Sequence, residues 1–136
     1  MASISVERTV GETKRAVIGG LTRYNEEKMG KQHYRRFAVS LREKKKIVGG
    51  VVGEVWMTVL FIQWFWIDEK FRGKGLGAKL IRKIEDEARR FGAVRAYVDT
   101  MSVQAPGFYR TCGYKAFGSL KGYPRGISRH WFTKTL

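Results

Sequence analysis

The sequence predicts an α+β (α/β) domain in which helices alternate with short strands around one sheet. Three observations support this prediction. Apolar residues recur at strand spacing in several short runs and at helix spacing in two longer ones. A long β-branched and aromatic run in the middle of the chain is typical of an interior strand. A glycine-rich connection then leads directly into an amphipathic helix.

Composition limits the number of domains and the kinds of partner and site that the chain can have. The chain has 136 residues, 43% of them hydrophobic, which is enough to bury the core of a single domain spanning residues 1–136. A net charge of +15 should attract anions such as phosphorylated cofactors, nucleic acid or acidic proteins. The single cysteine, Cys112, excludes a disulfide framework, and with only two histidines no metal site is expected. The chain shows no membrane-spanning stretch and no signal peptide, so we expect a cytoplasmic protein without a membrane partner.

The first third of the chain predicts one helix and two strands. A helix is expected over Glu12–Glu27, with a buried stripe made of Val17, Ile18, Leu21 and Tyr24. Arg35–Arg42 alternates apolar with polar residues, which predicts a strand with one buried face. Ile47–Val55 is β-branched and interrupted by glycine, and we expect a second strand there.

The run Trp56–Ile67 is apolar on both faces and predicts a central strand of a covered sheet. We interpret its tryptophans, Trp56, Trp64 and Trp66, as core residues rather than as a surface that stacks bases. A helix is expected over Leu76–Phe91, ended by Gly92. The remaining expected elements are a strand at Val94–Asp99, a short helix at Ala105–Thr111, and closing strands at Tyr114–Phe117 and Ser128–Lys134.

The connection before the second long helix predicts an anion site. In Arg72–Ala78, glycines let backbone N–H groups converge at a helix N-terminus, which suits phosphate oxygens. Arg72 and Lys74 add mobile positive charge. The segment is not a P-loop, because no Gly-Lys-Ser/Thr closes it, and it lacks the third glycine of the dinucleotide fingerprint.

Two motifs in register resemble one family. Arg72-x-x-Gly75-x-Gly77 is similar to the Q/R-x-x-G-x-G/A motif of the GCN5-related N-acetyltransferases (GNAT). Ser102–Tyr114 resembles that family's N-x-x-A-x-x-x-Y-x-x-x-G-F/Y pattern. The chain thus resembles a small, single-domain bacterial GNAT protein. The resemblance implies a mixed central sheet with a V-shaped splay between the strands at Trp56–Ile67 and Val94–Asp99, flanked by helices.

The resemblance also implies acetyl-CoA as co-substrate. Its pyrophosphate would bind the segment made of Arg72, Gly73, Lys74, Gly75, Leu76, Gly77 and Ala78. Its pantetheine arm would pair with the end of the central strand near Phe65 and Ile67, like an added strand. The second motif adds Ser102, Ala105 and Phe108 to the expected cofactor-binding set, although Phe108 is also a natural core residue.

Catalytic roles follow the same resemblance. Tyr109 matches the family tyrosine near the thioester sulfur, so we expect a general acid, with core packing as the alternative. The central strand has no carboxylate to act as base, and Gln63 can orient a substrate but cannot take its proton. Asp99 is the first remaining candidate, as base or substrate contact, and Glu54 is the second. A water relay, or an amine that binds already neutral, stays open.

The expected function is acetyl-CoA-dependent transfer of an acetyl group directly to a primary amine. A non-catalytic acyl-CoA-binding protein of the same fold and a basic nucleic-acid-binding module are the alternatives. Nucleic acid is expected to bind only weakly and without sequence preference, because no base-reading motif is present. The acceptor, a small-molecule or protein amine, stays open, as does the choice between monomer and homodimer. The positive charge disfavours polyamines and aminoglycosides unless acidic residues cluster locally.

Overall fold

A computed structural model describes residues 1–136, which divide into two compact units, Met1–His33 and Tyr34–Leu136. The first unit contains helix α1 (Gly11–Met29), which confirms the helix expected over Glu12–Glu27. No residue of α1 is buried, so the expectation of a buried stripe is wrong. The four stripe residues are all more than half exposed, because the first unit contains no second element to cover them.

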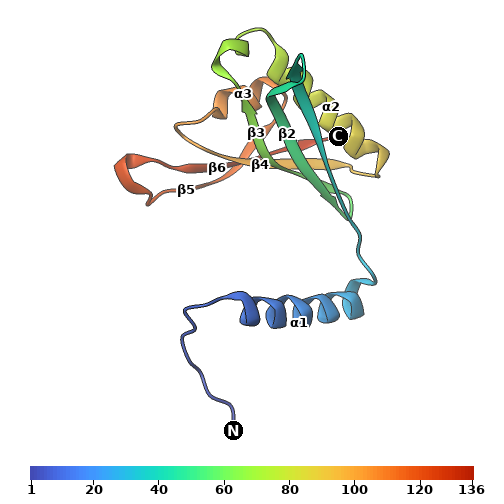
Figure 1. Ribbon diagram of the computed structural model, residues 1–136, viewed down its shortest axis with the longest axis vertical. Helices are drawn as coiled ribbons and strands as arrows, with labels where there is room; N and C mark the ends of the chain where they lie inside the picture. The colour runs from blue at the N-terminus through green and yellow to red at the C-terminus, as the bar shows by residue number, and fades with distance from the viewer. The chain divides into compact units, whose positions relative to one another are not determined.

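The second unit is a six-stranded mixed sheet with helices (Figure 1). The strands lie in the order β1-β2-β3-β4-β6-β5, and only the β3–β4 pair is parallel. This arrangement confirms the predicted α+β class and the mixed central sheet. The strands are β1 (Tyr34–Glu43), β2 (Lys46–Trp56), β3 (Val59–Ile67), β4 (Arg95–Met101), β5 (Lys115–Leu120) and β6 (Arg129–Thr135). The helices are α2 (Leu76–Arg90) and the short α3 (Pro106–Thr111), with 3₁₀ turns at Glu69–Phe71 and Pro124–Gly126.

Helix α2 covers one face of the sheet and closes the core. Its apolar stripe, which includes Ile81 and Ile84, is buried together with Leu60 and Ile62 of β3. Gly53 of β2 allows the close approach, since a Cβ there would lie 2.8 Å from Ile84 Cδ1. The helix ends as expected at Gly92, whose φ of 85° is left-handed. None of the helices combines the length and apolarity that a membrane span requires.

The strand expected at Trp56–Ile67 is central, as predicted, but it begins three residues later. Trp56 ends β2, and Met57 turns the chain back with a φ of 57°. The other expected elements match the observed ones to within three residues at each end.

The core assignment of all three tryptophans is wrong: Trp56, at the end of β2, is 36% exposed, and a β-bulge in β3 turns the other two away from the core. Val52 pairs with Trp64 and Gly53 with Ile62, so Gln63 has no partner on β2. The extra residue turns Trp64 and Trp66 to the face opposite α2, where their exposed fractions are 68% and 53%. The apolar run is therefore not covered on both sides.

Candidate active site

The sheet opens between its two parallel strands. Residues Val59–Ile62 of β3 pair with Arg95–Val98 of β4, after which β3 continues to Ile67 and β4 to Met101 without pairing with each other. This divergence is the V-shaped splay that the sequence resemblance implied. A cavity of about 880 Å³ lies there, bounded by both strands, the β3–α2 connection and α3.

The β3–α2 connection forms one end of this cavity. Gly73 and Gly75 have φ of 74° and 77°, left-handed values that glycine adopts without strain. No side chain caps the N-terminus of α2 and no acidic residue lies in its first turn, which leaves backbone N–H groups available for an anion. Arg72 was expected to be mobile, but its side chain is held in place, because its Nε donates a 2.8 Å hydrogen bond to the Ile67 carbonyl.

Aromatic rings line the cavity beside the start of α2. Phe65 and Phe108 stack with their centroids 5.2 Å apart, and both approach Gly77. A Cβ at Gly77 would lie 3.0 Å from the Phe108 ring, so glycine permits this packing. Phe108 therefore both lines the cavity and packs against the core.

Tyr109 lies on the cavity wall and is only 5% exposed. Burial, followed by the nearby Cys112 and Asp99, raises the pKa of Tyr109 to about 12. The phenol therefore stays protonated near neutral pH and is available as a donor. Cys112 is half-buried, and burial likewise raises the pKa of its thiol, which disfavours a nucleophilic thiolate.

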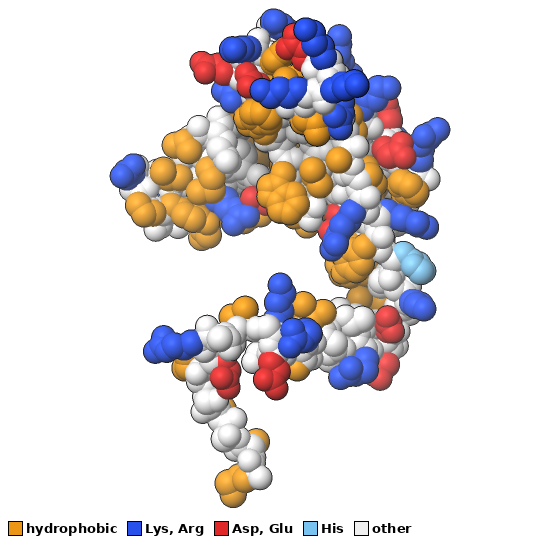
Figure 2. All heavy atoms as spheres, viewed as in Figure 1, with side chains coloured by type: hydrophobic (Ala, Val, Ile, Leu, Met, Phe, Trp, Pro, Cys, Tyr) orange, Lys and Arg blue, Asp and Glu red, His pale blue; other side chains and the backbone are white.

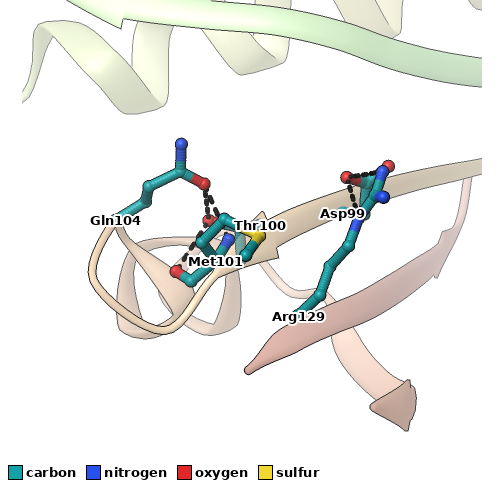
Figure 3. A network of polar contacts seen from close by, with 5 residues as sticks. All are labelled: Asp99, Thr100, Met101, Gln104 and Arg129. Atoms are coloured by element: carbon teal, nitrogen blue, oxygen red, sulfur yellow. Dashed lines mark hydrogen bonds and ion pairs between the residues drawn. The ribbon is translucent and has the colours of Figure 1, made fainter. Parts of the chain in front are cut away.

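Asp99 lies on β4 just beyond Val98, the last residue of that strand that pairs with β3, and it lines the cavity. Its Oδ1 accepts two hydrogen bonds from Arg129 of β6, at 2.9 Å from Nε and 2.6 Å from Nη2 (Figure 3). Nearby, the Gln104 amide oxygen accepts from Thr100 Oγ1 and from the Met101 backbone N–H, which fixes the turn after β4.

Glu54 reaches the cavity only through another residue. Its Oε2 accepts hydrogen bonds from Gln63 Nε2 at 3.1 Å and from Arg36 Nε at 3.2 Å, and Gln63 lines the cavity. Tyr97, which the sequence did not single out, lies near both acids. Burial first, then Asp99 and Glu54, raises the pKa of the Tyr97 phenol.

Most of the expected site residues meet at this cavity. Its lining includes Phe65, Ile67, Arg72, Gly73, Gly75, Leu76, Gly77, Ala78, Ala105, Phe108, Tyr109 and Asp99. Three expected residues lie outside the lining. Lys74 lies over the Phe71 ring at 5.6 Å, Ser102 Oγ accepts from the Ser128 backbone N–H, and Glu54 lies behind Gln63.

Sequence reasoning missed several of the lining residues. Trp64, Trp66 and Gln104 border the cavity without having been assigned to the site. The alternation of β3 gave no signal for the tryptophans, because the bulge at Gln63 reverses it.

Comparison with known proteins agrees with this architecture. Residues 10–114 match the family described as "Acetyltransferase (GNAT) family". A blasticidin-S acetyltransferase from Streptomyces morookaense is 41% identical over 95 residues, 69% of this chain and 70% of that protein. An acetyltransferase from Agrobacterium fabrum is 32% identical over 124 residues, 90% of each chain. The crystal structure of an acetyltransferase from Bacillus cereus superposes with a TM-score of 0.89 at 30% identity, covering 98% of both chains.

The fold, the splay and the cavity thus define an acyl-transferring domain of the N-acetyltransferase type. The chain belongs to the GNAT acetyltransferase family, whose reaction is the acetyl-CoA-dependent transfer of an acetyl group.

Proposed function

We propose that this N-acetyltransferase binds acetyl-CoA in the splay cavity and transfers the acetyl group directly to a primary amine of a small molecule. The observation that carries the proposal is the position of Tyr109, a buried and protonated phenol on the wall of a cavity between two diverging strands. A phenol in that place can protonate a departing thiolate.

The cavity's two ends suit the two parts of the cofactor. Gly73, Gly75 and the uncapped N-terminus of α2 offer backbone N–H groups to the pyrophosphate. Beyond Ile62, the edge of β3 that faces β4 has no partner strand, so its backbone can pair with the amides of the pantetheine arm.

Two proton transfers accompany the acyl transfer. As the C–N bond forms, the amine nitrogen loses a proton, and as the C–S bond breaks, the sulfur gains one. Tyr109 supplies the proton to sulfur and is reprotonated from water. We assign Asp99 to the amine, as base or hydrogen-bond acceptor, because it lines the cavity beside the splay while Arg129 holds it in place. Glu54 does not contact the amine itself; it orients Gln63, which lines the cavity, by accepting a hydrogen bond from the Gln63 amide.

The acceptor we propose is an amine-bearing antibiotic of the kind that the Streptomyces relative's name gives, blasticidin S. The support for this acceptor is that relative, because Glu54 and Asp99 are each paired with an arginine, Arg36 and Arg129, and add no net negative charge to the cavity.

The test is a free-thiol assay with acetyl-CoA and a panel of amines that includes blasticidin S. We expect thiol release that depends on the amine, and a fall of roughly 10²–10⁴-fold in turnover for Asp99→Asn if Asp99 is the base. A matched control is Asp86→Asn, an exposed carboxylate on α2. Binding of acetyl-CoA without thiol release for any amine would contradict the proposal and favour the non-catalytic acyl-CoA-binding alternative.

A further inference from the structure

Two exposed tryptophans border the cavity, and the cofactor site assigns no role to their side chains. Trp64 and Trp66 lie two residues apart on β3, on the face opposite α2, and both line the cavity. Their exposed fractions of 68% and 53% are unusual for so large an apolar side chain. Figure 2 shows apolar side chains, in orange, gathered over the middle of the second unit and over the β5–β6 hairpin.

The neighbours of these indoles on the same face are small. In an antiparallel pair, directly opposed residues share a face, so Trp64 lies beside Val52, and Trp66 beside Gly50. On the next strand, Val52 pairs with Ala38 and Gly50 with Ser40. No bulky side chain from β1 or β2 lies directly opposite the two indoles on this face.

Trp56 provides the contrast within the same sheet. Its ring stacks on Tyr34 with centroids 5.7 Å apart and an interplanar angle of 4°. Trp64 and Trp66 take part in none of the aromatic pairs of the chain. The indoles at the cavity thus retain free π-faces, whereas the indole away from it does not.

The same face carries the acidic groups of the site. Glu54 lies two residues from Val52 on β2, and its cross-strand partner Phe61 stacks on Tyr97 at 4.7 Å. Asp99 follows two residues after Tyr97 on β4, so alternation places it on this face too. A ligand lying on the indoles therefore has two carboxylates within the same surface as hydrogen-bond acceptors for its amine, each of them already paired with an arginine, Arg36 or Arg129.

We propose that Trp64 and Trp66 form the acceptor subsite and stack against a flat aromatic ring that carries the primary amine. This inference rests on the proposed function, in that the bound amine is the one acetylated. It narrows the acceptor to amines attached to planar rings. A base or aromatic ring stacked on an aromatic side chain contributes enough to change affinity by roughly 5- to 150-fold per contact.

The experiment compares two amines with the same carbon skeleton, 2-phenylethylamine with a planar aromatic ring and 2-cyclohexylethylamine with a saturated, puckered ring. Calorimetry on the full chain measures their affinities, and the free-thiol assay measures their turnover. We expect the planar amine to bind more tightly. Trp64→Ala and Trp66→Ala should weaken it by about 5- to 150-fold each, while Trp64→Phe retains most of the affinity. Trp56→Ala is the matched control and should leave both amines and acetyl-CoA unaffected.

The outcomes separate the subsite from the reaction. Equal affinity for the two amines, or unchanged affinity in both alanine variants, overturns the subsite. Thiol release that persists unchanged in those variants overturns the subsite and leaves the proposed function standing. Tryptophan-dependent binding without thiol release supports the subsite and contradicts the proposed function. If the alanine variants instead convert a dimer to a monomer in sedimentation velocity, without changing amine affinity, the indoles cover a second copy of the chain and the proposal is wrong.

Discussion

The Tyr114 hydroxyl donates a 2.7 Å hydrogen bond to Glu85 Oε2, and the two residues are only 2% and 1% exposed. Lys134 Nζ donates to the other oxygen, Oε1, at 3.0 Å. These contacts connect α2, the α3–β5 connection and β6. The Tyr114 ring also meets the Tyr109 ring edge-on at 6.0 Å, so the buried charge lies directly behind the proposed general acid.

Removing that charge should destabilise the fold strongly. Glu85→Ala leaves the Lys134 ammonium and the Tyr114 hydroxyl without their partner, and we expect a loss of about 3–5 kcal/mol in the free energy of unfolding. Urea denaturation measures it. The adjacent Asp86→Ala, which breaks an exposed pair with Arg89, should cost at most about 1 kcal/mol. Equal losses in the two variants would show that the buried network stabilises the fold no more than an exposed ion pair does.

Alkaline pH should destabilise the protein through Tyr109. Its pKa is raised to about 12 in the folded chain, whereas an unfolded tyrosine ionises near 10, so the neutral phenol stabilises the fold fully below about pH 10. That contribution is lost as the pH rises from 10 towards 12 and amounts to about 3 kcal/mol in total. Burial raises the pKa of Tyr114 in the same direction.

Denaturation of wild type and Tyr109→Phe between pH 8 and 11 checks this. Above about pH 10, the free energy of unfolding should fall more steeply for the wild type than for Tyr109→Phe. The phenol at this position ionises in the unfolded wild type, whereas the variant has no phenol there. Parallel curves for the two proteins would mean that Tyr109 ionises as readily in the folded chain as in the unfolded one.

The same Tyr109→Phe variant tests catalysis near neutral pH. If the hydroxyl protonates the thiolate, turnover should fall by roughly 10²–10⁴-fold, with little change in acetyl-CoA affinity. Steady-state kinetics with a known acceptor and calorimetry with acetyl-CoA measure the two quantities. Full turnover in a folded variant would leave Tyr109 a packing residue, in contact with Phe108, Tyr114 and Phe132.

Acetyl-CoA should raise the melting temperature, because it binds the folded chain alone. Free ligand at 100 times its Kd raises the free energy of unfolding by about 2.7 kcal/mol. Arg72→Glu should weaken this shift, since it reverses a charge at the proposed pyrophosphate site and removes the hydrogen bond to the Ile67 carbonyl. Lys83→Glu, on the exposed side of α2, makes the same charge change elsewhere and should preserve the shift. An equal loss in both variants would point to net charge rather than to the site.

The local features of the sequence predicted most of the architecture. The glycines after β3 and the stripe of α2 determine local geometry by themselves, so the turn before α2 and the helix itself were foreseeable, whereas the anion site stays a prediction. Contacts between distant residues were not. Arg129 lies 30 residues from the Asp99 that it holds, and Lys134 lies 49 residues from Glu85. The stripe of α1 predicted a helix correctly but could not show whether another element covers it.

The bulge at Gln63 has a consequence for how such an enzyme diversifies. Beyond it, odd positions of β3 such as Phe65 face the proposed cofactor side, and even positions such as Trp64 face the proposed acceptor side. One strand therefore serves two proposed tasks, cofactor binding and acceptor binding, through two separate sets of side chains. Mutations at the even positions can change which amine is accepted without disturbing the residues that meet acetyl-CoA. A combinatorial library restricted to Trp64 and Trp66 is accordingly the smallest pool in which new acceptor preferences should arise.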